Sequence, residues 1–180
     1  MVVGALEGDY LKGPLKGHLP KGIELGVKLH RAIDAFTDQH PKMAELRAQF
    51  PLELRRYSGI LIDLSFDHYL SKHWHNYSTL PLDAFNATIY RNLESHKHHL
   101  GPGARRMLLR MQQHDLLSVY GQWDSIAATA ARIGERFQRE NPFLQVAQHL
   151  DPVRPQLELS FLNFYPDLIE FCGLKKHQWN

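Results

Sequence analysis

Apolar residues recur every three or four positions along most of the chain, which is the spacing of an amphipathic α-helix. The clearest example covers residues 23–39, which Pro41 ends and whose apolar positions are Ile23, Val27, Leu29, Ile33 and Phe36. The same pattern predicts further helices over residues 42–49, 54–76, 81–99, 104–120, 123–137, 142–150 and 155–171. No stretch alternates apolar and polar residues with β-branched enrichment, so we expect no sheet and an all-α fold.

The chain of 180 residues has the length of one ordinary domain and no internal repeat or low-complexity linker. Gly101–Gly103 is the only candidate boundary, and we interpret it as a turn. We therefore predict a single compact multi-helix domain over residues 1–180. The short apolar start, residues 1–6, is read as part of a helix that has lost its beginning.

Composition narrows the class of protein further. Hydrophobic residues make up 43% and charged residues 22% of the chain, as in globular proteins. The one cysteine, Cys172, excludes an internal disulfide framework and fits a reducing compartment, so a cytoplasmic location is expected. No apolar run reaches the ~20 residues that span a bilayer, so we expect no membrane partner. A formal charge of +2 argues against a nucleic-acid partner.

The charge is unevenly distributed. Residues 95–114 contain no acid but four basic residues, Lys97, Arg105, Arg106 and Arg110. One interpretation is a solvated helix face. The other is a docking surface for an acidic partner, and the pattern leaves both open.

The helix over residues 23–39 carries the first candidate chemistry. His30, Asp34 and Asp38 are spaced four apart, so they lie above one another on one face. A histidine and two carboxylates on one face suit a metal site. A solvated stripe with hydrogen bonds between successive turns is the alternative.

A second pair of carboxylates, Asp63 and Asp67, is also spaced four apart. The surrounding helix is apolar nearly all round, which is typical of a buried helix. A buried carboxylate is costly unless it is paired or binds a metal, and no basic residue lies between Arg56 and Lys72. A divalent cation would supply the missing charge.

Carboxylates with one or two imidazoles favour Mn²⁺, Mg²⁺ or Fe²⁺ over a structural zinc. Such a metal would acidify a bound water and polarise a phosphoryl oxygen. Arg31 is the candidate clamp for a phosphate, since a guanidinium binds phosphate bidentately. The segment Gly8–Gly13, which contains Asp9, is a weak signal alone because Gly-Asp pairs are common in turns.

Together these segments, in this order, resemble the acyl carrier protein phosphodiesterases. The resemblance covers nearly the whole chain. The matching segments are Gly8–Gly13, Leu29–Asp38, Asp63, Asp67–His68, His73–Trp74, Leu117–Tyr120, Asn141–Pro142 and Phe161–Pro166.

The resemblance implies a helical enzyme distantly like the HD phosphohydrolases, with a divalent metal, Mn²⁺ most readily. It implies removal of the 4′-phosphopantetheine arm from holo acyl carrier protein, a small acidic partner that would suit the basic stretch. Two departures stand out. The doublet Asp67-His68 reverses the His-Asp order of HD enzymes. The family also usually begins with a further apolar segment, which we expect to be missing here.

Our hypothesis for the site follows from these residues. The metal is surrounded by Asp9, His30, Asp34, Asp67 and His68, with Asp38 and Asp63 as direct or supporting carboxylates. Asp67 is also counted with the catalytic residues, Arg31 steadies the charge that develops on the phosphate, and His73 is the candidate acid for the leaving serine.

Two alternatives remain. The same site could hydrolyse a nucleotide or another small phosphoester, in which case the basic stretch has no role. The chain could also be a non-enzymatic helical binding module whose carboxylates are structural.

Overall fold

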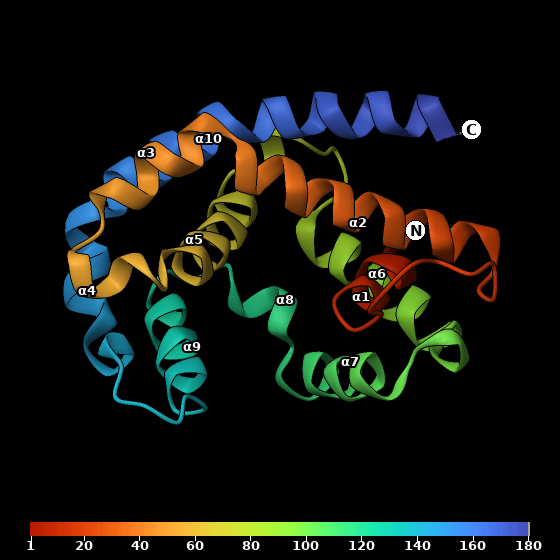
Figure 1. Cartoon of the computed structure of the whole chain (residues 1–180), viewed down its shortest axis with the longest axis horizontal. Helices are drawn as coiled ribbons and strands as arrows, with labels where there is room; N and C mark the ends of the chain where they lie inside the picture. Colours follow the sequence, from red (N-terminus) through yellow and green to blue (C-terminus); the bar gives the residue numbers. More distant parts are fainter. Residues whose placement is uncertain (180) are drawn as a thin grey trace. The chain divides into compact units, whose positions relative to one another are not determined.

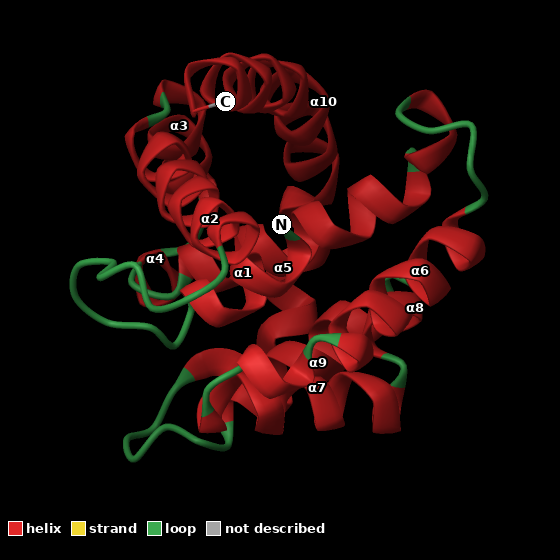
Figure 2. Ribbon diagram, turned by 90° about the vertical axis from the view of Figure 1, so that its right-hand side faces the viewer, coloured by secondary structure: helices red, strands yellow, loops and turns green. Residues whose placement is uncertain are grey.

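The computed structural model describes residues 1–179, except for the side chain of Leu144. Within this part of the chain the structure is helical with connecting loops and contains no strand, so the predicted all-α class is confirmed (Figures 1 and 2). The HD-like resemblance of the fold stays a prediction. The elements, where η marks a 3₁₀ turn, are α1 Val2–Gly8, α2 Lys21–Gln39, α3 Pro41–Gln49, α4 Leu52–Arg55, α5 Ser58–Lys72, η1 Trp74–Asn76, α6 Leu82–Ser95, η2 Lys97–His99, α7 Pro102–His114, α8 Leu116–Val119, α9 Asp124–Gly134, η3 Pro142–Gln145 and α10 Val146–Trp179.

Three predicted helices are interrupted. The helix expected over residues 81–99 is divided into α6 and η2. The helix expected over residues 54–76 is divided into α4, α5 and η1. The helix expected over residues 104–120 ends at Asp115, which has a left-handed backbone with φ of 43° and whose N–H bonds to the Met111 carbonyl. Aspartate tolerates this conformation better than most residues, and the cap satisfies a carbonyl that the helix end would otherwise leave open.

The last helix is longer than the prolines predict. We expected one helix over residues 142–150 and another over 155–171, but α10 continues through Pro152, Pro155 and Pro166. All three prolines lie on exposed positions. There water can satisfy the carbonyl that loses its helical partner, so a proline on the outer side need not end a long helix.

The chain divides into two compact units, each made of several segments. Unit 1 comprises residues 1–38, 80–118 and 167–180, and unit 2 comprises residues 39–79 and 119–166. Helices α2 and α10 contribute residues to both.

The core of unit 1 joins α1, α2, α6 and α7. Its buried members are Val3, Ile23, Leu93, Leu100, Ala104 and Leu108. Glu7, which is 6% exposed, is buried beside this cluster, and its Oε2 accepts a hydrogen bond of 2.8 Å from the Gly101 N–H. The Gly101–Gly103 turn is therefore tied to α1, 94 residues earlier in the sequence.

Two glycines let α1 and α2 approach at backbone distance. A Cβ added to Gly4 would lie 2.0 Å from the Ile23 carbonyl oxygen, and a Cβ added to Gly26 would lie 2.2 Å from the Met1 carbonyl oxygen. Real Cβ contacts are never this short, so only glycine fits at either position. The crossing directs the end of α1 toward the middle of α2.

Unit 2 is built around buried aromatic rings. Tyr69 of α5 is fully buried, packs on Trp123 and Phe161, and donates its hydroxyl hydrogen to the Arg154 carbonyl over 2.9 Å. Aromatic pairs of this kind stabilise a core beyond their buried area. The ring contacts of Tyr69 hold α5 against Trp123 and, through Phe161, against α10.

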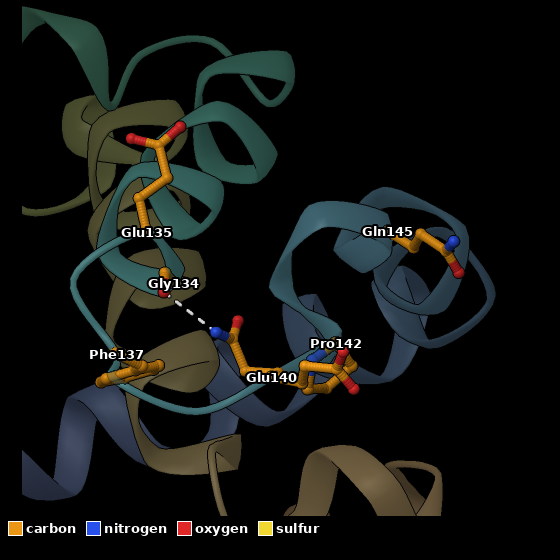
Figure 3. A pocket seen from close by; sticks show the side chains of 7 residues that line it. Gly134, Glu135, Phe137, Glu140, Pro142 and Gln145 are labelled. Carbon is orange, nitrogen blue, oxygen red and sulfur yellow. Dashed lines mark hydrogen bonds between the residues drawn. The ribbon is translucent and has the colours of Figure 1, made fainter.

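The side chain of Asn141 caps the start of η3. Asn141 precedes Pro142, and its Oδ1 accepts from the Phe143 N–H. Its Nδ2 donates to the Gly134 carbonyl, the bond that is dashed in Figure 3. These residues border a hollow of about 490 Å³. Figure 3 shows Glu135 and Gln145 pointing away from one another across it. No residue of the predicted catalytic or metal site lines this hollow, so we assign it no part in the chemistry.

The hydropathy of the helices gives one further result. In residues 1–179, none of them combines the length and the apolar character that crossing a membrane requires.

The glycine crossing makes a prediction about stability. Replacing Gly4 or Gly26 by alanine should lower the free energy of unfolding by about 1–3 kcal/mol, because the added methyl group must push two backbones apart. Urea unfolding followed by circular dichroism measures this. Gly22→Ala is the matched control, since no atom lies within 4 Å of its added Cβ. Equal behaviour of all three variants would contradict the crossing.

Candidate functional site

Three of the predicted residues meet in unit 1. His30 lies in the middle of α2, Asp34 lies one turn later, and Asp9 follows directly after α1. The His30 Nε2 lies 3.0 Å from Asp9 Oδ1 and 3.3 Å from Asp34 Oδ2. The imidazole is 21% exposed, while the two carboxylates are more than half exposed. The group is therefore open to a ligand from solvent on its carboxylate side.

Gly8 is what allows Asp9 to reach His30. A Cβ on Gly8 would lie 2.4 Å from His30 Cδ2, so the imidazole ring occupies the space of the missing side chain. Tyr10 packs in the same way against Gly103, whose added Cβ would lie 2.4 Å from the Tyr10 ring. In the segment Gly8–Tyr10, which is a weak signal in the sequence, Gly8 leaves room for the His30 ring and Asp9 contacts its Nε2.

The two carboxylates change the titration of His30. The hydrogen bond to Asp9 raises the pKa of the imidazole, and the charge of Asp34 adds to this against the opposing effect of burial. Burial in turn raises the pKa of the Asp34 carboxyl, although the charge of His30 lowers it. Asp38, one turn further along α2 and exposed, adds a smaller like-charge effect on Asp34. A place for Asp38 around a metal stays a prediction.

Arg31 has a structural contact that sequence reasoning missed. Its Nη2 donates to the Leu11 carbonyl over 2.6 Å, and its Nη1 donates to the Gly13 carbonyl over 2.8 Å. The guanidinium therefore fixes the loop that follows Asp9. Its predicted role as a phosphate clamp stays a prediction, and it would require the guanidinium to serve the loop and the phosphate together.

The carboxylates of α5 belong to unit 2 and are exposed, which corrects the expectation that they are buried. The surrounding protein atoms and the like charge of Asp63 raise the pKa of the Asp67 carboxyl to about 7. The apolar pattern predicted burial on every side of α5, because the strip of exposed residues that carries Asp63 and Asp67 is narrow.

His68 lies on the buried side of α5, away from the exposed strip that carries Asp63 and Asp67. It is 4% exposed, packs on Tyr69 and Trp123, and its Nδ1 lies 2.9 Å from the Tyr120 carbonyl oxygen. Burial lowers the pKa of the ring, so the neutral form is favoured, with the hydrogen on Nδ1. Its Nε2 is buried without a partner in the described residues. A backbone partner of this kind orients metal-binding histidines, but whether His68 is a ligand stays a prediction.

His73, the predicted acid, follows α5 in unit 2. Its Nε2 lies 2.7 Å from Glu158 Oε1, and the same oxygen accepts from Lys72 Nζ over 2.6 Å. Partial burial acts to raise the pKa of Glu158, but the hydrogen bonds from Lys72 and His73 lower it overall. Glu158 is thus an ionised partner that orients His73. Sequence reasoning missed it because it lies 85 residues away on α10, outside every motif.

The four predicted partner-binding residues fall into two groups in unit 1. Lys97 pairs with Glu94, and Arg105 donates from Nε to the Lys97 and Leu100 carbonyls and from Nη2 to the His98 carbonyl. Arg106 and Arg110 are exposed and, within residues 1–179, form no hydrogen bond or ion pair with another side chain.

The residues of unit 1 fit a divalent cation in donor type. Adjacent ligands of an octahedral ion bound at about 2.0–2.1 Å lie roughly 3 Å apart, close to the 3.0 and 3.3 Å observed around His30. Nitrogen with carboxylate oxygen suits Mn²⁺ or Fe²⁺. Across the described residues, no three or more His, Cys, Asp or Glu side chains already converge on one metal position. Binding therefore requires His30 to exchange its hydrogen bonds for the metal.

The cluster predicts a measurable titration. In protein freed of metal with EDTA, the pKa of His30 should lie above its usual 6.5, and Asp9→Asn should lower it. Because the folded pKa is raised, the added stability is full below pH 6.5 and is lost as pH rises through the folded value. Two-dimensional NMR of the imidazole measures the pKa directly. An unchanged pKa in Asp9→Asn would contradict the Asp9 contact.

The family model described as acyl carrier protein phosphodiesterase matches residues 1–168. Curated relatives named acyl carrier protein phosphodiesterase include one from Klebsiella pneumoniae (strain 342), 30% identical over 96% of this chain and 90% of its own length. Another, from Pectobacterium atrosepticum, is 27% identical over 95% of this chain and 89% of its own length. No solved structure matches significantly. The resemblance seen in the sequence is confirmed, and the chain belongs to the acyl carrier protein phosphodiesterase family.

Proposed function

We propose that this protein is a phosphodiester hydrolase that removes 4′-phosphopantetheine from holo acyl carrier protein. The observation that carries the proposal is the family match over residues 1–168, which includes every residue of the predicted site. The cluster Asp9–His30–Asp34 supports it independently, because it gathers an imidazole and two carboxylates at an accessible position.

The reaction breaks the bond between phosphorus and the serine oxygen of the carrier protein. Water adds its oxygen to phosphorus, and the pair of electrons of the broken bond leaves with the serine oxygen. That oxygen gains a proton to become a free hydroxyl group, and 4′-phosphopantetheine is released. The protein must therefore orient the phosphate, accept a proton from water and donate one to serine.

We propose that Asp9, His30 and Asp34 hold a divalent cation, Mn²⁺ first among the candidates and Mg²⁺ or Fe²⁺ after it. When bound, such a cation lowers the pKa of water and offsets charge on the phosphoryl oxygens. Asp38, one turn further along α2, is the further proposed ligand or supporting group in unit 1. The roles of Asp63, Asp67 and His68, which belong to unit 2, stay predictions from the sequence.

Other groups position the site. Gly8 and the bonds from Arg31 to the Leu11 and Gly13 carbonyls fix Asp9 and its loop. A fixed carboxylate requires little rearrangement during the reaction, which favours catalysis. Arg31 is also proposed to offset charge on the phosphate.

His73 is proposed to donate the proton to the serine oxygen. Glu158 holds its ring by the 2.7 Å contact to Nε2 and compensates a positive charge on it. Glu158→Gln should therefore lower kcat, because the His73 ring loses the group that orients it, and His73→Gln should lower kcat further. Wild-type kcat in both variants would contradict the role of His73.

The direct test is intact-protein mass spectrometry of holo acyl carrier protein. With Mn²⁺, the wild-type protein should convert it to the apo form, and EDTA should stop the reaction. His30→Gln should slow conversion by roughly 100-fold or more, because loss even of groups that only support metal ligands costs about 10–100-fold. His177→Gln, an exposed histidine near the end of α10, is the matched control and should retain full activity.

Circular dichroism of each variant confirms that it is folded. Wild-type protein that leaves the holo form intact with Mn²⁺, Mg²⁺ and Fe²⁺ would contradict the proposed reaction. Cleavage of small phosphodiesters in the same experiment would then favour a small phosphoester as substrate.

A further inference from the structure

Helix α7 presents an outer side that nothing in unit 1 covers. Ala104 and Leu108 face the core, whereas Arg106, Leu109 and Arg110 are exposed. Arg106 and Arg110 are four residues apart and lie above one another, and Leu109 lies beside them. The helix contains no acidic residue, so the positive charge of this side is not balanced within it.

The four basic residues of this region differ in whether they already form contacts within the protein. Arg105 bonds to the carbonyls of Lys97, His98 and Leu100, so it closes the end of η2, and Lys97 is paired with Glu94. Arg106 and Arg110 have no such contact among the described residues. Of the four basic residues, Arg106 and Arg110 are thus the two that can bind a partner without breaking a contact among the described residues.

A recess of about 400 Å³ adjoins the arginines. It is lined by Leu108 and Leu109 together with the charged or polar residues Arg105, Lys97, Glu94 and Gln112. Leu109 is 57% exposed, lines the recess and lies beside Arg106 and Arg110 on the helix. A single exposed leucine is ordinary, but a recess that contains two leucines, beside an unbalanced pair of arginines, has the composition of a small protein-binding surface.

We propose that the outer side of α7 docks the acidic carrier protein. Arg106 and Arg110 face carboxylates of the partner, and an apolar side chain of the partner enters the recess beside Leu109. Charge complementarity selects this occupant, since a second copy of the chain would place arginine against arginine. The inference rests on the proposed function and names the surface by which the substrate is held.

The experiment uses full-length protein in two assays. The first measures KM and kcat for conversion of holo carrier protein, and the second measures binding of apo carrier protein by calorimetry. The double variant Arg106→Glu/Arg110→Glu should raise KM and Kd by about tenfold or more, because like charges then meet across the interface. Leu109→Ala should raise both several-fold, and kcat should change little in either variant.

Arg136→Glu/Arg139→Glu is the matched control, because it makes the same charge change on exposed residues of unit 2. It should leave KM and Kd near wild type. Added salt should weaken binding of wild type more than binding of Arg106→Glu/Arg110→Glu. Arg105→Gln should lower the melting temperature, since it removes bonds that hold η2.

The outcomes are distinct. Wild-type turnover with equal KM and Kd in the α7 variant and in its control would overturn the docking surface and leave the proposed function standing. Wild type that neither binds nor converts the carrier protein would overturn both.

Discussion

The backbone contact of α1 with α2 at Gly4 and Gly26 is the constraint on which the candidate site depends. A side chain at either position would force the helices apart, because the space is filled by carbonyl oxygens. Gly8 repeats this one turn later, where the His30 ring takes the place of a Cβ. Two glycines of α1 and one of α2 thus place Asp9 3.0 Å from a histidine 21 positions later.

This steric arrangement has an electrostatic consequence. The carboxylates of Asp9 and Asp34 make the electrostatic potential around the His30 ring negative. This potential favours binding of a positive charge, which is either the second proton of His30 or a metal ion. The raised pKa of His30 and the donor set are two results of the same geometry. Competition between proton and metal then links metal affinity to pH, since the ligand must be deprotonated.

Helical spacing predicted part of this site. His30 and Asp34 were found from their separation of four residues, because α2 is regular there. The contact to Asp9 could not be found from spacing, since it depends on a glycine crossing and a loop held by Arg31. For Asp67 and His68, adjacency in the sequence was a poor guide: consecutive residues of a helix point about 100° apart. Which of the two faces the core was decided by Tyr69 and Trp123.

The sequence pattern predicted the all-α class of the fold better than it predicted where the individual helices begin and end. Periodicity gave the helices, because an apolar stripe must be buried against a neighbour. It did not predict the end of α7 at Asp115, which depends on one backbone angle. It also predicted that the prolines would end the last helix, whereas Pro152, Pro155 and Pro166 are exposed and α10 continues through them. Glu158, the partner of His73, depends on tertiary packing that no local pattern contains.

The most direct test of the central claim is the affinity of the metal-free protein for Mn²⁺, followed by the electron paramagnetic resonance signal of the free ion. Wild type should bind the ion, and Asp9→Asn, His30→Gln and Asp34→Asn should each weaken binding by about tenfold or more. Asp83→Asn, an exposed carboxylate elsewhere in unit 1, should bind as wild type does. Equal Mn²⁺ affinity in all five proteins would contradict the claim that this cluster holds the cation.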